Sequence, residues 1–300
     1  MTDTSDARQP AAVARATLVG GTAVLMWATL APLTILAGTV PPFLLVALTF
    51  GLGALVGIGW QIARGEDPRR HLRQSPRAWA IGVGGLFGYH FVYFLSLRLA
   101  PAVEVSLINY LWPLLIVLFS ALLPGERLRS WHVAGALAGL AGTVLLVTRG
   151  GAVAVSAANV PGYLLALAAA VLWAAYSVLR RRFGDAPTEA VAGFCLATSV
   201  LAGLCHLLLE TTAWPADATT WAAVVALGLG PVGGAFYVWD QGVRKGDIRA
   251  LGALSYATPL LSTVLLIGLG FAPGHWTVWR ACALIAGGSI LASRDLLRRR

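Results

Sequence analysis

Long apolar stretches, separated by short polar segments, follow one another along almost the whole chain. Each stretch holds about 20 residues, the length of a helix that crosses the hydrocarbon core of a bilayer. The stretches lack the strict alternation of apolar and polar residues found in membrane-barrel strands, so helices are expected. Ten membrane-spanning helices are predicted, at 17–37, 41–63, 78–98, 102–123, 130–148, 161–180, 189–209, 220–243, 248–270 and 275–293.

The composition agrees with an all-α integral membrane protein and excludes a soluble domain. Of the 300 residues, 58% are apolar and only 12% are charged, with a mean hydropathy of +0.75. A soluble domain has about a quarter charged residues. Gly and Pro are abundant, as is common in spans that pack against neighbouring helices.

The N-terminal segment and the cysteines give no sign of processing, disulfides or metal binding. Residues 1–15 lack the basic start and small-residue cleavage site of a secretory signal, so the first span is expected to stay attached. Cys195, Cys205 and Cys282 lie inside predicted spans without paired spacing, which favours simple packing. No metal and no cofactor is expected.

Basic residues lie mainly on one side of the predicted topology. An even number of spans places the termini and the breaks after the second, fourth, sixth and eighth spans on one side of the membrane. Of the 22 Lys and Arg residues, all but Arg98, Arg149 and Arg280 then lie on that side. Lys and Arg concentrate in cytoplasmic loops, so cytoplasmic N and C termini are predicted. The net charge of +9 is then a topological feature, and no nucleic-acid partner is expected.

The chain contains an internal repeat with an offset of 146 residues. This offset relates NYLWPLL at 109–115 to SYATPLL at 255–261, and also Trp27 to Trp173 and Gly88 to Gly234. Five spans per half is an odd number, so the second half must enter the membrane from the opposite face. We expect two inverted five-helix repeats, at 16–150 and 151–294, with cytoplasmic tails at 1–15 and 295–300.

Pro113 and Pro259 occupy equivalent positions in the middle of predicted spans. A proline inside a helix removes a hydrogen bond and bends the helix, and a membrane tolerates this only where protein or a wet cavity satisfies the freed carbonyl. The fourth and ninth spans are therefore predicted to be bent, to line a cavity and to act as gates. A kink used only for packing is the alternative.

Aromatic and polar side chains lie near the centres of several predicted spans, whereas Trp usually marks the headgroup region. An N–H or O–H group that faced acyl chains would stay unpaired, at a cost of about 1–3 kcal/mol, so these groups should turn inward. Aromatic walls with a few polar tips suit a ligand that is partly apolar and partly polar. For Trp27, Tyr110, Trp173 and Tyr256, helix packing is an equal alternative.

His90 and Glu104 are candidates for binding or coupling because ionisable groups at membrane depth usually serve a function. His90 could instead be a hydrogen-bonded structural residue. Glu104 could attract an amine or a proton, or could simply complement the N-terminus of the fourth span.

Two further acids are expected to make local contacts near span ends. Asp240 precedes Arg244 by four residues, the favourable order for a helical ion pair. Glu126, in PGERLRSW, is expected to cap the fifth span or to pair with Arg127 or Arg129.

The two halves, the segments APAVEVSLINYLWPLL and GDIRALGALSYATPLL, and LPGERLRSWHVAGALAGLAGTVLLV resemble the drug/metabolite transporter superfamily, EamA-type. FYVWDQGVRKGDIRALGALSYATPLLST is most similar to the aromatic amino acid exporters within it. This resemblance covers nearly the whole chain and implies an inner-membrane exporter that hydrolyses no ATP. The cavity lining that it implies is Trp27, Tyr89, His90, Tyr93, Asn109, Trp112, Trp173, Tyr176, Tyr237, Trp239 and Ser255.

The second half departs from symmetry at two places that bear on coupling. Ala272 stands where the repeat of Glu126 would lie, and no histidine repeats His90. Proton coupling, facilitated diffusion and exchange all stay open.

The expected function is export of aromatic and other neutral amino acids by alternating access through a midplane cavity. A broad exporter of cationic drugs, with Glu104 as counter-ion, is the alternative. A membrane-embedded enzyme is disfavoured because HExxH, GxSxG and paired intramembrane acids are absent, as is a Walker loop. The expected partners are a small-molecule substrate and the bilayer, with the chain acting as a monomer.

Overall fold

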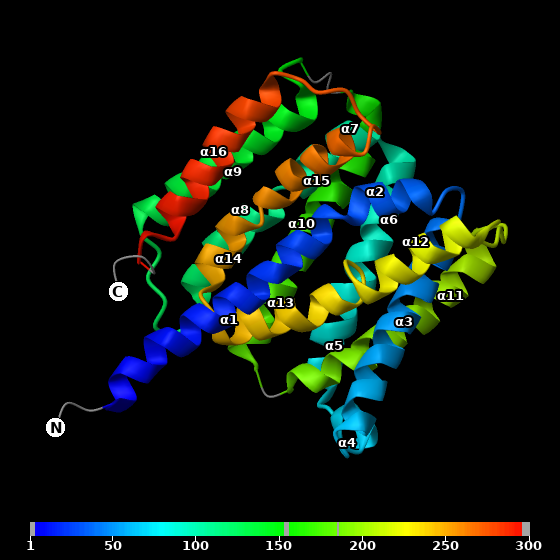
Figure 1. Ribbon diagram of the computed structural model, residues 1–300, viewed down its shortest axis with the longest axis horizontal. Helices are drawn as coiled ribbons and strands as arrows, with labels where there is room; N and C mark the ends of the chain where they lie inside the picture. The colour runs from blue at the N-terminus through cyan, green and yellow to red at the C-terminus, as the bar shows by residue number, and fades with distance from the viewer. Residues whose placement is uncertain (1–3, 153–155, 185, 296–300) are drawn as a thin grey trace.

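The computed structural model describes residues 4–152, 156–184 and 186–295, and every regular element in these ranges is helical (Figure 1). Among the residues described, nine stretches are long and apolar enough to cross a membrane, and a shorter apolar helix, Thr277–Ala292, follows them. The all-helical membrane fold predicted from the sequence is confirmed.

In the first half, most predicted spans are built from two helical pieces. The elements are α1 (Thr4–Ala28), α2 (Leu30–Leu36), α3 (Pro42–Ala63), the short surface helix α4 (Pro68–Leu72), α5 (Pro76–Val83), the π-helix η1 (Gly84–Gly88), α6 (Tyr89–Leu99), α7 (Ala102–Asn109), α8 (Trp112–Phe119) and α9 (Ser130–Thr148).

The second half repeats this order with fewer interruptions. It comprises α10 (Val160–Arg182), α11 (Val191–Leu209), α12 (Ala218–Leu229), α13 (Gly234–Lys245), α14 (Ile248–Leu254), α15 (Ala257–Gly268) and α16 (Thr277–Ala292). Short 3-10 turns lie at Ser120–Leu122, Ala157–Asn159 and Thr188–Ala190.

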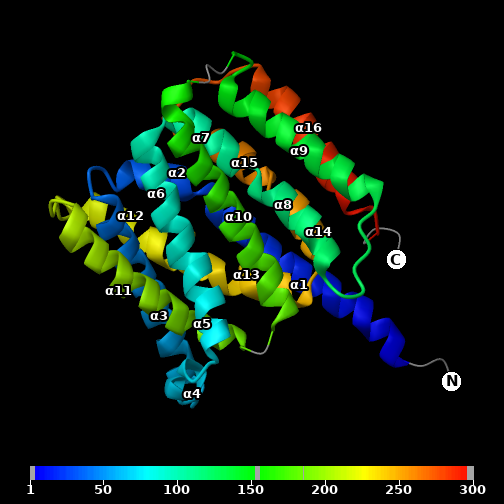
Figure 2. The ribbon, with the colours of Figure 1, turned by 180° about the vertical axis from the view of Figure 1, so that it is seen from behind.

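The helix pairs formed between the two halves follow a two-fold symmetry: replacing each helix of a pair by its equivalent gives a pair that is also formed. Helix α3 packs on its equivalent α11, and α9 packs on its equivalent α16. The symmetry equivalent of the pair α1 and α13 is the pair α10 and α6, and the helices of both pairs are in contact (Figures 1 and 2). Each half therefore completes the packing of the other.

Equivalent helices run in opposite directions. The start of α9 meets the end of α16, where a Cβ added to Gly135 would overlap the Gly288 carbonyl oxygen. The start of α3 meets the end of α11, where the Glu210 carboxylate accepts hydrogen bonds from the N–H groups of Phe43 (2.9 Å) and Leu44 (3.2 Å). Two equivalent helices that are antiparallel place their halves upside down relative to each other.

Close helix contacts depend on glycine where α1 crosses α13. A Cβ on Gly20 would lie 2.6 Å from the Cα of Gly242, which is closer than real side chains approach. Small residues of this kind let membrane helices pack backbone to backbone, because lipid gives no hydrophobic drive for helix association.

Most basic residues gather at one end of the bundle. We call the basic end the one formed by 64–75, 123–129, 183–184, 186–187 and 246–247, and the opposite end the one formed by 37–41, 100–101, 149–152, 210–217 and 269–276. The start of α1 and the segment after α16 also reach the basic end, where Asp295 pairs with Arg129 at 3.8 Å and Thr17 accepts the Asp247 N–H at 2.8 Å.

Candidate functional site

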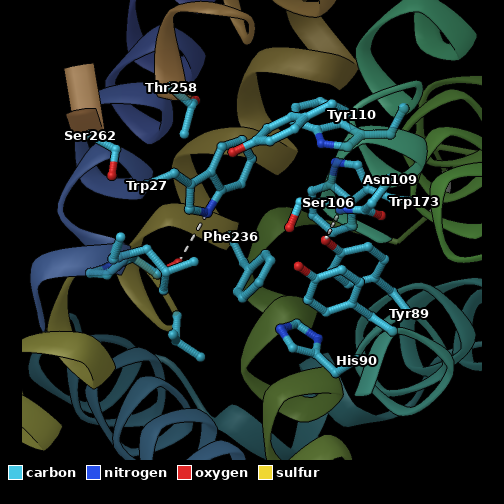
Figure 3. Close-up of a pocket in the computed structure, with 16 residues that line it drawn as sticks. Trp27, Tyr89, His90, Ser106, Asn109, Tyr110, Trp173, Phe236, Thr258 and Ser262 are labelled. Carbon is cyan, nitrogen blue, oxygen red and sulfur yellow. Dashed lines mark hydrogen bonds between the residues drawn. The ribbon is translucent and has the colours of Figure 1, made fainter. Parts of the chain in front are cut away.

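A cavity of about 200 Å³ lies between the two halves and is lined mainly by aromatic side chains (Figure 3). Both halves contribute, and the lining residues are Trp27, Leu30, Ala31, Tyr89, His90, Tyr93, Ser106, Asn109, Tyr110, Trp112, Trp173, Pro231, Val232, Phe236, Thr258 and Ser262. Seven of the eleven residues predicted as substrate contacts are among them: Trp27, Tyr89, His90, Tyr93, Asn109, Trp112 and Trp173.

Several helices are interrupted at the depth of this cavity. Helix α1 breaks at Thr29, and α7 gives way to α8 at Tyr110–Leu111. In the second half, α12 gives way to α13 at 230–233, and α14 to α15 at Ser255–Tyr256. Irregular backbone inside a membrane is tolerated where it is buried in protein or lines a cavity, so the breaks mark the site.

The two prolines at which bends were predicted lie in the first turn after two of these breaks. Pro113 follows Trp112 at the start of α8, and Pro259 lies three residues into α15. The missing N–H of proline is harmless in a first helical turn, where it has no intrahelical partner. The orphan N–H of Leu114 donates instead to the Tyr256 hydroxyl of the other half, at 3.2 Å.

A π-helical turn, η1, directly precedes the tyrosines that line the cavity. It lies at Gly84–Gly88, immediately before Tyr89, and such turns commonly mark functional sites. Tyr89 and Tyr93 stack with their rings 5.9 Å apart and 8° from parallel. A Cβ on Gly85 would overlap the ring of Tyr176, so the turn also needs a glycine to pack against α10.

Aromatic rings in mutual contact form the apolar wall. The Trp27 ring lies 6.0 Å from that of Trp112 and 5.7 Å from that of Trp173, both edge-on. The Trp27 indole N–H donates to the Pro231 carbonyl at 3.0 Å, in the break between α12 and α13. The ring is therefore fixed by hydrogen bonding as well as packing.

Uncharged polar groups also line the cavity, among these rings. Asn109 Nδ2 donates to the Tyr89 hydroxyl at 3.1 Å, whereas its Oδ1 is buried without a partner. The Thr258 hydroxyl is likewise buried and unpaired. Since buried polar atoms are normally paired, these two groups are ready to bind a ligand.

His90 is held as a specific tautomer. Its Nδ1 lies 2.7 Å from the Leu86 carbonyl oxygen, which can only accept, so Nδ1 carries the proton. The ring stands edge-on to Phe50 at 5.1 Å and to Phe236 at 6.3 Å. Nε2 is then the acceptor that a neutral His90 offers.

Packed side chains close the cavity toward the basic end. Beyond Trp173 on α10 lie the buried Tyr176 and Ser177, and the Trp239 indole N–H donates to Ser177 Oγ at 3.1 Å. Helix α8 packs on α14, and α10 on α13, at this end. Within the described residues, the equivalent pairs, α7 with α15 and α1 with α6, make no comparable contact and flank the cavity at the opposite end. The cavity is therefore closed at the basic end and open at the other.

Four predicted contacts lie outside the cavity lining. Tyr176 packs behind Trp173 at 5.2 Å, Trp239 bonds to Ser177, Tyr237 donates to the Gly53 carbonyl at 2.9 Å, and Ser255 donates to the Leu251 carbonyl at 2.8 Å. The hydrogen-bonding groups of Tyr237, Trp239 and Ser255 serve the walls around the cavity, whereas the Tyr176 hydroxyl is buried without a partner. The π-turn and the helix breaks rotate side chains in ways that a regular helical period does not follow.

Nine lining residues are absent from the predicted substrate contacts: Leu30, Ala31, Ser106, Tyr110, Pro231, Val232, Phe236, Thr258 and Ser262. A signal did exist for two of them. Thr258 and Ser262 are four residues apart, which places both hydroxyls on one face of α15.

The acids near span ends make contacts that differ from the expected ones. Glu126 pairs with Arg181 and Arg249, and the expected partners Arg127 and Arg129 are wrong. The N-terminus of α9 is closed instead by His132 Nδ1, which accepts the Arg129 N–H at 3.1 Å.

Asp240 does meet Arg244, at 3.5 Å, but its shortest contact is with Arg180 Nε at 2.7 Å. Glu104 accepts a hydrogen bond from the Tyr163 hydroxyl at 2.9 Å and is not part of the cavity lining. Within the described residues, no group of three or more His, Cys, Asp or Glu side chains is placed to hold a metal.

Comparison with known proteins agrees with this two-fold architecture. Residues 15–148 and 160–294 each match the EamA-like transporter family. The chain belongs to the EamA-like transporter family. Members of this family are multi-pass membrane transporters, and this chain has the apolar helices expected of one.

Two relatives and one solved structure cover nearly the whole chain. The aromatic amino acid exporter YddG of Ancylobacter novellus is 58% identical over 286 residues, covering 95% of this chain and 98% of that protein. The aromatic amino acid exporter YddG of Salmonella typhimurium is 27% identical, covering 92% and 96%. A crystal structure of a protein that is 58% identical superposes with a TM-score of 0.89, covering 95% of this chain and 99% of the other.

Proposed function

We propose that this protein exports aromatic and other neutral amino acids across a bacterial inner membrane, by alternating access through the central cavity. The observation that carries the proposal is the chemistry of the lining, which combines aromatic rings with uncharged polar groups. The 58% identity to an exporter of aromatic amino acids supports the same substrate class.

The size of the cavity favours one small solute. Its volume of about 200 Å³ lies below the range of about 300–1,000 Å³ typical of sites for drug-sized ligands. An amino acid with a flat aromatic side chain can pack against the wall formed by Trp27, Trp112 and Trp173, where edge-to-face contacts are favourable.

The polar groups of the cavity suit a zwitterion. Asn109 Oδ1 and His90 Nε2 are acceptors for an α-ammonium group, and the hydroxyls of Tyr89, Ser106 and Thr258 are donors for an α-carboxylate. The two charges of the substrate also neutralise each other, which lowers the cost of holding it at membrane depth.

Export of cationic drugs, the alternative, has less support. A lone cation at membrane depth needs a counter-charge, and the lining contains no carboxylate in the described residues. Glu104, the acid expected to serve, is engaged by Tyr163. The substrate therefore carries its own balancing charge.

Orientation follows from the distribution of basic residues. We place the basic end and both termini in the cytoplasm, since Lys and Arg concentrate in cytoplasmic loops. The cavity then opens to the periplasm. We propose gating at the breaks before Pro113 and Pro259, a monomer as the working unit, and repeat boundaries near residues 150 and 294.

Counterflow in proteoliposomes tests the proposal. Vesicles loaded with unlabelled tryptophan should accumulate labelled tryptophan and phenylalanine well above labelled threonine or methionine, and His90→Ala should lower the rate. Repeating the assay with an imposed pH gradient tests His90 and Glu104 as proton carriers, which an unchanged rate would eliminate. Absence of exchange for every amino acid, with folded protein in the vesicles, would refute the proposal.

A further inference from the structure

Glu126 joins the two halves of the protein at the basic end. This residue lies in the segment between α8 and α9, and its carboxylate receives Arg181 at 2.8 Å from the end of α10 and Arg249 at 3.3 Å from the start of α14. Its side chain is 15% exposed, so solvent screens these pairs only in part. One acid thus holds two arginines of the other half.

Neighbouring hydrogen bonds tie the same segments together. Arg249 also donates to the Arg127 carbonyl at 2.9 Å, and Arg182 donates to the Leu122 carbonyl at 3.0 Å. Both bonds run from the second half to the segment around Glu126. They converge on the point where α8 packs against α14.

Asp247 keeps Arg249 in place for this contact. Its carboxylate lies 3.3 Å from the guanidinium and accepts the N–H groups of Arg249 (3.0 Å) and Ala250 (3.1 Å), which caps α14. Burial alone would raise the pKa of Asp247, but Arg249 and the backbone N–H groups hold it below its usual value. The carboxylate therefore stays ionised near neutral pH.

A buried ion pair lies next to the contacts of Glu126, since Arg180 directly precedes Arg181 in α10. Arg180 Nε contacts Asp240 at 2.7 Å, and Thr188 donates to the same carboxylate at 2.8 Å. Both charged side chains are almost fully buried. This pair ties α10 to α13 at the level where the cavity is closed.

The opposite end carries no matching charges. The positions that correspond to Glu126, Arg181 and Arg249 through the repeat offset of 146 residues hold uncharged residues. They are Ala272, Ile35 and Val103, respectively. Within the described ranges, the ion pair recorded at that end, His206 with Glu210 at 2.9 Å, lies in one segment and joins no two halves. A two-fold exchange of conformations would thus close the opposite end without an ion pair equivalent to those of Glu126.

We propose that Glu126, with Arg181 and Arg249, forms an ionic clamp that holds the basic end closed and makes this outward-open conformation the resting state. The proposal rests on the alternating-access function given above. For the cavity to open toward the basic end, α8 must leave α14, and the pairs of Glu126 break at that step. Symmetric halves would otherwise favour the two conformations nearly equally.

Thiol labelling from the cytoplasmic side tests the clamp without any substrate. Ser177→Cys, in a background where Cys195, Cys205 and Cys282 are replaced by alanine, places a reporter between the cavity and the basic end. In inside-out vesicles, a membrane-impermeant maleimide should label this cysteine slowly, because Ser177 is buried. Glu126→Gln should raise the labelling rate about tenfold, since the rate follows the population of the inward-open state.

Glu66→Gln is the matched control. Glu66 also lies at the basic end and pairs with Arg64 at 3.1 Å and His71 at 3.2 Å, but all three belong to one segment of the first half. Its loss should leave the labelling rate unchanged. Arg249→Gln should act like Glu126→Gln, which gives a second variant if the first fails to fold.

Salt gives a measurement on the unmutated clamp. Raising ionic strength from about 0.1 to 1 M shortens the screening length from about 10 to 3 Å, so labelling should quicken with Glu126 present and respond less in Glu126→Gln. Two results would overturn the clamp: equal labelling rates in Glu126→Gln and Glu66→Gln, or a lower unfolding temperature of Glu126→Gln without faster labelling. Either result would mean that the contacts of Glu126 only stabilise the fold. Because labelling needs no amino acid, this failure differs from a failure of the proposed transport.

Discussion

The two proline-containing segments share a backbone but differ in what their side chains do. Both NYLWP and SYATP interrupt a span at the depth of the cavity. In the first half, Asn109, Tyr110 and Trp112 all line the cavity. In the second, only Thr258 does so, while Ser255 and Tyr256 are fully buried in packing.

This difference shows how a symmetric backbone holds an asymmetric ligand. The repeat preserves the break, because both halves need a bent span next to the cavity. The side chains at matching positions have separate tasks, since an amino acid has one apolar end and one charged end. Substitutions at matching positions therefore separate the shared structural role from the binding role.

The largest contrast is expected at positions 112 and 258. Trp112 is 7% exposed and touches three other tryptophans, so Trp112→Ala should cost about 3–5 kcal/mol of stability and lower tryptophan counterflow at least about tenfold. Thr258→Ala should leave the unfolding temperature almost unchanged and lower counterflow less. Similar losses at the two positions would mean that the halves bind the substrate alike.

The next contrast lies between the two tyrosines. Tyr256→Phe removes the hydroxyl that accepts the Leu114 N–H, which leaves a buried donor unpaired at a cost of about 1–3 kcal/mol. Tyr110→Phe should change stability by less than about 0.5 kcal/mol and act on transport instead. Thermal unfolding in detergent measures the first effect and counterflow the second. A loss of stability in Tyr110→Phe together with a loss of transport in Tyr256→Phe would contradict this assignment.

A smaller contrast is expected at positions 109 and 255. Asn109→Ala removes the buried acceptor that we assign to the substrate, and should raise KM about tenfold, equivalent to roughly 1.4 kcal/mol. Ser255→Ala removes only a bond to the carbonyl of its own helix and should be nearly silent. An unchanged KM in Asn109→Ala would return this amide to structural packing.

The span pattern, the repeat and the interruptions near Pro113 and Pro259 could be predicted from the sequence, because each depends on local composition or on a fixed offset. Mid-span aromatic residues also identified much of the cavity. The orientation of Tyr237 and Trp239 could not be predicted, since the break at 230–233 shifts the helical register before α13.

Long-range pairing was the other limit. Glu126 reaches Arg181 and Arg249 only because inverted halves bring α10 and α14 to the same end, and nearby arginines gave a simpler local expectation. Short polar residues such as Ser106 and Ser262 escaped notice because serine is common in membrane helices as a packing residue.

A cavity-filling variant tests the central claim most directly. Thr258→Trp places an indole in the cavity at the position equivalent to Trp112, and the measurement is counterflow of labelled tryptophan in proteoliposomes at matched protein density. Transport should fall to the level of protein-free vesicles while the unfolding temperature stays within a few degrees of the parent protein. A folded Thr258→Trp protein that exchanges tryptophan at the parent rate would contradict transport through this cavity.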